Sequence, residues 1–311
     1  MSRCLIVTNL ADEFAGEIER LSDTSIPLKA FATAESALAA YTDETVLFGN
    51  PQLIAEILPS MPTVNWVQSS WAGVTPLIEA ERRDYVLTGV KDVFGPQMSE
   101  YTFGYLLAHE LRILARHERQ TARVWHREHS GVLAGKTLGI MGTGSIGSHI
   151  AATARAFDMK SLGLSRSGEA VAGFDDVLPV DRLDEFLSRS DHLVATLPAT
   201  PGTDKLLNAD TLPLLPAGAY FVNVGRSNVV DDNALITSLR NAHLGGAALD
   251  VFDVEPVPDD SPLWSAPNLS ITAHIAAISH PMLIVPIFVE NYRRYISDQP
   301  LKYVVDFSAG Y

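Results

Sequence analysis

The chain has 311 residues, 47% of them hydrophobic and 19% charged, and a formal net charge of −14 at pH 7. That length and composition are typical of a globular protein with two domains of ordinary size. The acidic balance argues against proteins that bind nucleic acid or anionic membranes, because both surfaces attract positive charge.

Cysteine usage and hydropathy limit the setting further. The single cysteine, Cys4, cannot form an internal disulfide, and no His and Cys residues have the spacing of a zinc site, so no metal is expected. The first residues read as a strand and not as a signal peptide, and no run of 18 apolar residues could span a membrane. We therefore expect a protein of the reducing cytoplasm with no membrane contact.

Short β-rich runs alternate with longer amphipathic stretches, which predicts parallel α/β architecture. In the first third, the expected strands are residues 4–8, 45–50 and 63–70. Residues 98–128 have helical periodicity interrupted only by Gly104, and we expect one long helix that serves a domain crossover or a dimer contact.

A second strand–helix series follows, and it is dense enough for a doubly wound sheet. A helix is then expected at residues 281–299, where the chain returns to the first domain. The predicted domains are therefore 1–97, 98–278 and 279–311, the last being a segment that rejoins the first. The five or six strands of the second series lie at 136–141, 161–168, 192–200, 219–228, 245–253 and 269–276.

The turn GTGSIG at residues 142–147 matches G-x-G-x-x-G, between a predicted strand and an amphipathic helix. Gly142 permits a tight turn, Gly144 lets the backbone approach a pyrophosphate, and Gly147 lets helix and strand pack closely. A glycine-rich connection without a ligand is the alternative, and the strand–turn–helix context favours a dinucleotide site. The residues expected to contact the dinucleotide here are Gly142, Thr143, Gly144, Ser145 and Ile146.

The next strand ends in Ser165, Arg166 and Ser167, where an NAD site usually carries an acidic residue. A guanidinium can pair with a ribose 2′-phosphate through two hydrogen bonds, and the flanking hydroxyls add donors. These residues predict a preference for NADP(H). A solvated arginine beside an NAD(H) site is the alternative.

Three later strand ends each present a group capable of acid–base or anion-binding chemistry. Arg226 follows one strand and can grip a carboxylate in two hydrogen bonds. His274 follows another and can give a proton to an oxygen as hydride reaches the neighbouring carbon. Asp250, Asp253 and Glu255 follow a third, and Glu255 bonded to His274 would orient the ring. Each has a structural alternative, namely a surface ion pair, a buried histidine or a loop carboxylate, but together they suit reduction of a 2-oxo acid.

The motifs GTGSIG, NVGRSNVVDDNAL, ALDVFDVEP and TAHIAA, in this order and spacing, resemble those of the D-isomer-specific 2-hydroxyacid dehydrogenases over nearly the whole chain. SPLW at 261–264, AHIAAI at 273–278 and the ending VDFSAGY at 305–311 are most similar to the glyoxylate/hydroxypyruvate reductase A branch. The resemblance implies two Rossmann-like, doubly wound domains, an active site in the cleft between them, and a homodimer formed through the cofactor domains.

The resemblance also implies roles for individual residues. Arg226 would bind the substrate carboxylate and keto oxygen, His274 would donate the proton, and Glu255 would orient it. The loop at 68–75 would hold the carboxylate through its backbone N–H groups. Its residues in contact with substrate would be Trp71, Ala72 and Gly73. The further residues expected to line the cofactor are Leu197, Pro198, Thr203, Val224, Gly225, Arg226, Asp250, His274 and Ala276.

Three departures from the family pattern bear on the substrate. Trp71 and Thr75 stand where relatives often have Gly and Asp, which predicts a bulkier or more apolar pocket wall. His280 stands where the reductase A branch often has Arg, which weakens the case for small polar substrates. Ala273 replaces a usual Pro, a change that we expect a strand end to tolerate.

We therefore predict an NADPH-preferring reductase of 2-oxo acids that forms D-2-hydroxy acids, with glyoxylate and hydroxypyruvate as first candidates and larger 2-oxo acids next. A dinucleotide-sensing protein, like corepressor relatives of the family, is one alternative, although sensing alone needs no acid–base group. A dehydrogenase of a phosphorylated hydroxy acid is another, although residues 68–75 contain no basic side chain.

Overall fold

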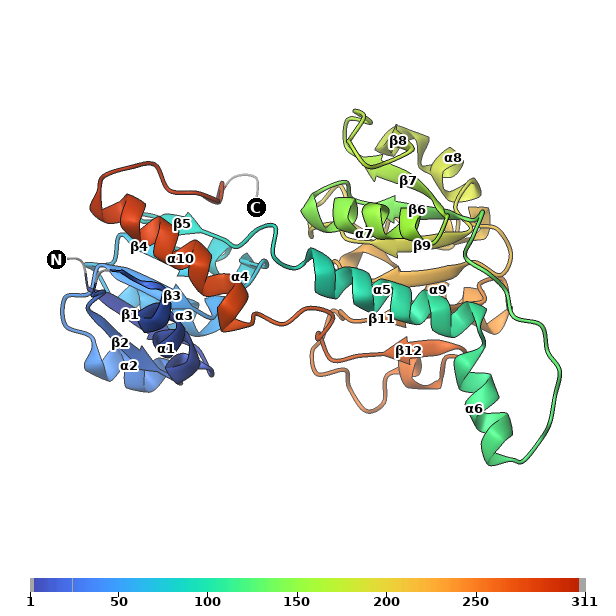
Figure 1. Ribbon diagram of the computed structural model, residues 1–311, viewed down its shortest axis with the longest axis horizontal. Helices are drawn as coiled ribbons and strands as arrows, with labels where there is room; N and C mark the ends of the chain where they lie inside the picture. Colours follow the sequence, from blue (N-terminus) through green and yellow to red (C-terminus); the bar gives the residue numbers. More distant parts are fainter. Residues whose placement is uncertain (1–2, 24, 308–311) are drawn as a thin grey trace. The chain divides into compact units, whose positions relative to one another are not determined.

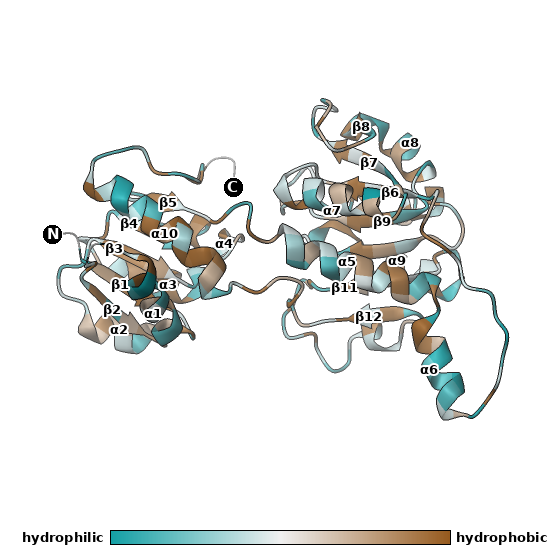
Figure 2. Cartoon of the chain, viewed as in Figure 1, coloured by the Kyte–Doolittle hydropathy of each residue, from teal (hydrophilic) through white to brown (hydrophobic). Residues whose placement is uncertain are grey.

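The computed structural model describes residues 3–23 and 25–307 (Figure 1). The last four residues of the ending VDFSAGY lie outside the described residues. The described chain forms two parallel sheets, of five and seven strands, which confirms the predicted α/β class. Hydrophobic residues gather in the strands of both sheets (Figure 2). In the described parts of the chain, no helix is long and apolar enough to cross a membrane.

The chain divides into two compact units. One is formed by Met1–Val93 together with Ser279–Tyr311, and the other by Phe94–Ile278. The first division lies earlier than the predicted one at residue 97, because helix α5 (Gly95–Glu110) already belongs to the second unit.

The first unit has the strand order β2-β1-β3-β4-β5, with every pair parallel. Its strands are β1 (Cys4–Val7), β2 (Leu28–Phe31), β3 (Val46–Gly49), β4 (Trp66–Ser69) and β5 (Val86–Thr88). The sequence did not predict β2 and β5, which are short edge strands with polar residues among the apolar ones. Helices α1 and α10 cover one face of the sheet, and α2, α3 and α4 cover the other (Figure 1). The helices are α1 (Ala11–Leu21), α2 (Ala34–Ala40), α3 (Pro51–Ile57), α4 (Thr75–Ile78), α10 (Pro281–Ile296) and the 3-10 helix η1 (Leu58–Ser60).

Aromatic packing ties the last helix, α10, to the N-terminal sheet. Phe48 of β3 and Phe288 of α10 stack with ring centroids 4.3 Å apart, and Phe14 of α1 meets Phe48 edge-on at 5.3 Å. Trp66 of β4 also stacks on Phe288, at 5.6 Å, and all four side chains are buried. Aromatic pairs stabilise a folded core by more than their buried area alone would give, so α10 is part of this unit's core.

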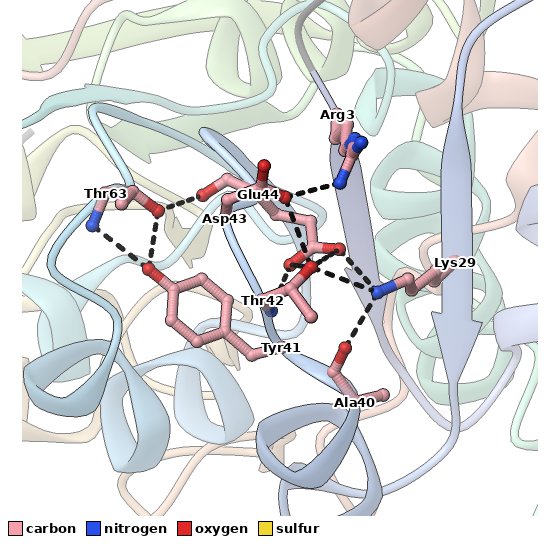
Figure 3. A network of polar contacts seen from close by, with 8 residues as sticks. All are labelled: Arg3, Lys29, Ala40, Tyr41, Thr42, Asp43, Glu44 and Thr63. Atoms are coloured by element: carbon pink, nitrogen blue, oxygen red, sulfur yellow. Dashed lines mark hydrogen bonds and ion pairs between the residues drawn. The ribbon is translucent and has the colours of Figure 1, made fainter.

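Figure 3 shows a polar network next to the amino-terminal ends of β1 and β3, around Glu44, which is 1% exposed. Lys29 Nζ lies 2.7 Å from Glu44 Oε1 and donates to the carbonyl oxygen of Ala40. The N–H of Thr42 donates to Glu44 Oε2, and the hydroxyl of Thr63 donates to the Glu44 carbonyl oxygen, both at 2.8 Å. Burial by itself raises the pKa of Glu44, but the Lys29 ammonium and the Thr42 N–H outweigh it and lower the pKa to about 2.

Replacing Glu44 with glutamine is expected to lower the free energy of unfolding by about 1–3 kcal/mol at neutral pH, because a buried charged hydrogen bond is lost. Since the pKa of Glu44 is lower in the folded chain than in the unfolded one, its contribution is complete above about pH 5 and declines as the pH falls from about 4 to 2. Urea unfolding of both proteins near neutrality and near the acid end of this window measures the difference, which should shrink in acid. Asp43→Asn, which removes an exposed pair with Arg3, is the control and should cost less than about 1 kcal/mol. A difference that persists undiminished in acid would contradict the role of the charge.

The second unit has the strand order β12-β11-β10-β9-β6-β7-β8, again with every pair parallel. The chain order reverses between β6 and β9, and sheets of this type bind ligands at the carboxyl ends of strands around such a point. The strands are β6 (Thr137–Met141), β7 (Lys160–Ser165), β8 (Asp176–Pro179), β9 (His192–Ala195), β10 (Tyr220–Asn223), β11 (Gly246–Leu249) and β12 (Leu269–Ile271). The sequence did not predict β8, whose four residues DVLP include a charge and a proline.

Helices cover both faces of this second sheet. α5 and α7 pack on one face, and α8 and α9 pack on the other (Figure 1). The helices not yet delimited are α7 (Ser145–Ala156), α8 (Leu183–Ser188), α9 (Asp232–Arg240) and the 3-10 helices η2 (Val180–Arg182), η3 (Leu212–Leu214), η4 (Ser227–Val229) and η5 (Pro262–Ser265). The sheet is thus doubly wound, as the sequence predicted.

The single long helix expected at 98–128 is wrong. α5 ends at Glu110, and a separate helix, α6 (Ile113–Thr121), follows it. Arg112 between them has φ +51°, in the left-handed region that interrupts a helix. Glu110 fixes the end of α5, because its buried carboxylate lies 2.9 Å from Nε2 of the buried His192 at the start of β9. α6 has no buried residue that could hold it in line with α5.

Candidate active site

The glycine turn follows β6 and opens α7, at the point where the strand order reverses (Figure 1). Gly142 has φ +106°, and a Cβ there would lie 2.6 Å from Thr196 Oγ1, so a side chain is excluded. A Cβ at Gly147 would lie 1.9 Å from the carbonyl oxygen of Gly142. A Cβ at Gly144 would meet no protein atom within 4 Å, so packing does not require this glycine. Two glycines therefore shape the turn, and the third leaves its backbone open to a bound group.

The turn fits a pyrophosphate. Gly144 is the N-cap of α7 and brings no side chain to cap it. The first N–H groups of a helix lack partners within the helix and carry partial positive charge. The hydroxyl of Ser148 donates to the Thr143 carbonyl oxygen at 3.3 Å and orders the turn from within. The backbone at Thr143, Ser145 and Ile146 therefore offers N–H groups of the kind that bind phosphate oxygens.

The end of β7 carries the residues predicted to select the cofactor. Ser165 Oγ accepts from the N–H of Gly168 at 3.0 Å, which closes the turn after the strand. Arg166 is exposed, and among the described residues no hydrogen bond or ion pair engages its guanidinium. Ser167 Oγ accepts from the N–H of Glu169 at 3.4 Å. A guanidinium and two hydroxyls thus stand where an NAD site has a carboxylate, and they suit a phosphate better than a ribose hydroxyl.

The loop after β9 contains Leu197, Pro198 and Thr203. Thr203 Oγ1 donates to the Pro198 carbonyl oxygen at 2.8 Å and accepts from the N–H of Thr200 at 2.9 Å, so the hydroxyl braces the loop. A Cβ at Gly225 would lie 2.8 Å from the Leu197 carbonyl oxygen, so the turn after β10 packs directly on this loop. Leu197 is half-buried and Pro198 is exposed, and their contact with a cofactor stays a prediction.

Arg226 follows β10 and is half-buried, and its Nη1 donates to the Gly225 carbonyl oxygen at 2.7 Å. The buried Asn223 shapes the turn, because its Oδ1 accepts from Gly225 N at 3.1 Å and its Nδ2 donates to the Arg226 carbonyl oxygen at 3.0 Å. Sequence reasoning missed Asn223, for which a polar residue closing an apolar strand was the signal. Val224 is buried. Burial lowers the pKa of Arg226, and Glu255 partly offsets this, so that carboxylate lies within electrostatic reach.

Glu255 and His274 form a hydrogen-bonded pair. His274 Nδ1 lies 3.0 Å from Glu255 Oε2, while Glu255 Oε1 accepts from the N–H of Phe252 at 3.0 Å. The side chain of Glu255 is 39% exposed and that of His274 is 49% exposed, so a small molecule can reach the ring. Because an ionised carboxylate only accepts hydrogen bonds, Nδ1 carries the hydrogen of this bond and Nε2 is the nitrogen available to a substrate.

Asp250 organises the loop that carries His274. Its buried carboxylate accepts from Ile275 N through Oδ1 and from Ala276 N through Oδ2, both at 2.8 Å. Its carbonyl oxygen accepts from His274 N at 2.9 Å. His274 has φ +55°, a left-handed conformation that costs energy outside glycine, and these bonds hold it there. Contacts of Asp250 and Ala276 with a cofactor stay a prediction.

These side chains share one edge of the seven-stranded sheet. The glycine turn follows β6, Arg166 follows β7, Arg226 follows β10, Asp250 and Glu255 follow β11, and His274 follows β12. Since all the strands are parallel, their carboxyl ends lie along the same edge. The glycine turn and the candidate acid–base groups are therefore presented together by this unit.

Residues 103–276 match the model of a family described as "D-isomer specific 2-hydroxyacid dehydrogenase, NAD binding domain". The chain belongs to this dehydrogenase family. It is 40% identical to a family protein from Aeromonas salmonicida subsp. salmonicida, whose crystal structure it matches over 99% of this chain and 100% of that one with a TM-score of 0.94. An NADPH-dependent glyoxylate/hydroxypyruvate reductase from Sinorhizobium meliloti, solved with NADP and sulfate, is 27% identical over 100% of both chains with a TM-score of 0.87. Glyoxylate/hydroxypyruvate reductase A of Salmonella newport is 33% identical over 175 residues, so the match spans 56% of each chain.

The predicted substrate loop of this dehydrogenase follows β4 in the five-stranded unit. Ser69 anchors it, because its Oγ accepts from Trp71 N at 3.0 Å and donates to the Trp71 carbonyl oxygen at 2.9 Å. Trp71 and Gly73 are half-buried, Ala72 is exposed, and the loop leads into α4 at Thr75. The loop is thus ordered around its tryptophan, and its contact with substrate stays a prediction.

Proposed function

We propose that the chain is an NADPH-preferring reductase that converts 2-oxo acids to D-2-hydroxy acids, with glyoxylate and hydroxypyruvate first and larger 2-oxo acids next. The observation that carries the proposal is the His274–Glu255 pair, joined at 3.0 Å, on the same sheet edge as Arg226 and the glycine turn. The NADPH-dependent glyoxylate/hydroxypyruvate reductase activity of the Sinorhizobium meliloti relative supports it.

Each residue has a distinct task in this proposal. The reduced nicotinamide supplies the hydride when the cofactor is bound. Arg226 binds the substrate carboxylate, because a guanidinium stays charged and presents its donors in a fixed plane. His274 gives a proton from Nε2 to the carbonyl oxygen. Glu255 holds Nδ1 and so fixes the direction in which Nε2 points.

Initial rates of cofactor oxidation with glyoxylate, hydroxypyruvate and phenylpyruvate, each with NADPH and with NADH, test the proposal. We expect reduction of at least one of the three and a higher kcat/KM with NADPH. A ranking led by phenylpyruvate would indicate that Trp71 favours apolar side chains. Tight NADPH binding without reduction of any 2-oxo acid would overturn the proposal and favour a dinucleotide sensor. Activity restricted to a phosphorylated 2-oxo acid would overturn the assigned substrate class.

Replacing Arg166 with alanine is expected to lower kcat/KM for NADPH by about 10- to 100-fold, because a charge-assisted pair with the 2′-phosphate is lost. The value for NADH should stay within about twofold, since NADH has no such phosphate. Steady-state kinetics with both cofactors check this. The matched control is Arg182→Ala, since Arg182 is an exposed arginine of the same unit paired with Glu185. Equal losses with the two cofactors would contradict a role in selection.

We also propose a homodimer formed through the seven-stranded units, with α6 and its flanking segments as the contact. Helix α6 and its flanking segments carry exposed large apolar side chains, and Trp125 is 91% exposed. Such a cluster marks an interaction surface more often than a solvated one. The apolar residues are Leu111, Ile113, Leu114, Val124, Trp125 and Val132.

Sedimentation velocity measures directly whether the chain is a monomer or a dimer. The wild-type chain should sediment as a dimer, and Leu114→Asp should shift it towards monomer by placing a charge in an apolar contact. The control is Val180→Asp, because Val180 is an exposed apolar residue of η2 in the same unit. A monomeric wild type, or a dimer that Leu114→Asp leaves intact, would contradict this contact.

A further inference from the structure

A line of hydroxyl contacts leads from the His274 loop to helix α5. Tyr101 Oη, on α5, lies 2.7 Å from Thr272 Oγ1. Thr272 Oγ1 in turn lies 2.5 Å from Asp250 Oδ1. Thr272 follows β12 directly, so the line joins a helix on one face of the sheet to the loop that begins at the strand's end.

The donors and acceptors in this line have one arrangement. The Asp250 carboxylate already accepts from Ile275 N and Ala276 N and has no hydrogen to give, so the Thr272 hydroxyl donates to it. Thr272 has then used its single hydrogen, and its oxygen accepts from Tyr101. Burial raises the pKa of Tyr101, so its hydroxyl keeps the proton that it donates. Each bond polarises the next, which strengthens the series.

We propose that Tyr101 and Thr272 are positioning residues for the proton donor His274, acting through Asp250. The inference rests on the proposed reductase function. Asp250 holds His274 at φ +55° only while its carboxylate stays aligned with two N–H groups of the loop. The Thr272 hydroxyl adds a third bond to that carboxylate, and Tyr101 fixes the direction of the hydroxyl.

The tyrosine hydroxyl can be removed without removing its ring. The Tyr101 ring lies 4.8 Å from that of Tyr105 and packs against the core of the unit, contacts that phenylalanine keeps. Tyr101→Phe therefore breaks the hydroxyl line with little change in packed volume. Thr272→Val removes the hydroxyl that contacts Asp250 directly, with almost no change in side-chain shape. Thr272→Ser keeps that hydroxyl.

Steady-state kinetics with NADPH and the best of the three 2-oxo acids give the first test. Tyr101→Phe and Thr272→Val should each lower kcat about three- to tenfold, the usual worth of one hydrogen bond, with KM for NADPH unchanged within about twofold. Thr272→Ser should recover most of the wild-type kcat. The double variant should lose little more than Thr272→Val alone, because the two hydroxyls act in one series. Strictly multiplicative losses would overturn that coupling.

Hydrogen exchange gives a readout that does not need turnover. The amides of Ile275 and Ala276 should exchange faster in Tyr101→Phe than in the wild type, since the carboxylate that accepts from them is less firmly held. The control is Tyr85→Phe, because Tyr85 is a buried tyrosine of the five-stranded unit whose hydroxyl lies 3.4 Å from the Leu77 carbonyl oxygen, and it should change neither quantity.

The outcomes separate the two proposals. Unchanged kcat and unchanged exchange in Tyr101→Phe would overturn the positioning role while leaving the reductase in place. A wild type that reduces none of the 2-oxo acids would overturn the reductase, and faster exchange in the variant would then still support the hydroxyl line as the element that orders the loop.

Discussion

Replacing His274 with alanine is expected to lower kcat for 2-oxo acid reduction by about 10²- to 10⁴-fold, the usual range for loss of a general acid. The ring is half-exposed and hydrogen-bonds to Glu255, while the backbone of the loop is held separately by Asp250. The substitution therefore removes the imidazole without opening the core. Single-turnover rates measure the chemical step, and a fluorescence titration of NADPH should give a Kd within about threefold of the wild type.

Two further variants make this result specific. Glu255→Gln keeps the side-chain shape but replaces an acceptor by an amide, so the loss of kcat should be smaller than that of His274→Ala. The matched control is His243→Ala, since His243 is a half-buried histidine that precedes β11, at the opposite edge of the sheet from His274. If His274→Ala turns over at the wild-type rate, the histidine is not the proton donor.

Short-range signals in the sequence were enough to predict the sheet edge that carries the site. Gly142 and Gly147 are required by a turn whose geometry forbids a side chain, and such a requirement is written directly into residue type. Polar residues that close apolar strands, such as Arg226 and His274, could be placed because parallel strands bring their carboxyl ends to one edge.

Contacts between distant residues could not be read in the same way. The Tyr101–Thr272 bond joins positions 171 residues apart, and although Thr272 opens the TAHIAA motif, nothing in that motif points to Tyr101. The left-handed backbone at His274 likewise depends on Asp250. The sequence predicted that Asp250 lines the cofactor, and the structure shows its carboxylate accepting hydrogen bonds from the His274 loop. The helical spacing of apolar residues continues through Arg112, although the helix does not. A break at one residue leaves the apolar pattern of its neighbours intact, so the sequence pattern could not show it.

Replacing Arg226 with alanine is expected to lower kcat/KM by about 10²- to 10³-fold, with KM for the 2-oxo acid raised and kcat lowered. Both parameters change because one guanidinium would bind the carboxylate in the ground state and polarise the keto oxygen as charge develops on it. Because Arg226 is half-buried, its charge is less screened by water than that of a solvated arginine. Steady-state kinetics over a series of 2-oxo acid concentrations measure the split.

Arg226→Lys separates charge from geometry. Lysine keeps the positive charge but lacks the planar pair of donors, so it should recover only about tenfold of the loss seen with alanine. Added guanidinium ion should partly rescue Arg226→Ala and leave Arg240→Ala, a control at the exposed end of α9, unaffected. Full activity in Arg226→Lys would mean that charge alone matters and that the two-bond grip is absent. Wild-type KM and kcat in Arg226→Ala would contradict a role for this guanidinium in binding the carboxylate.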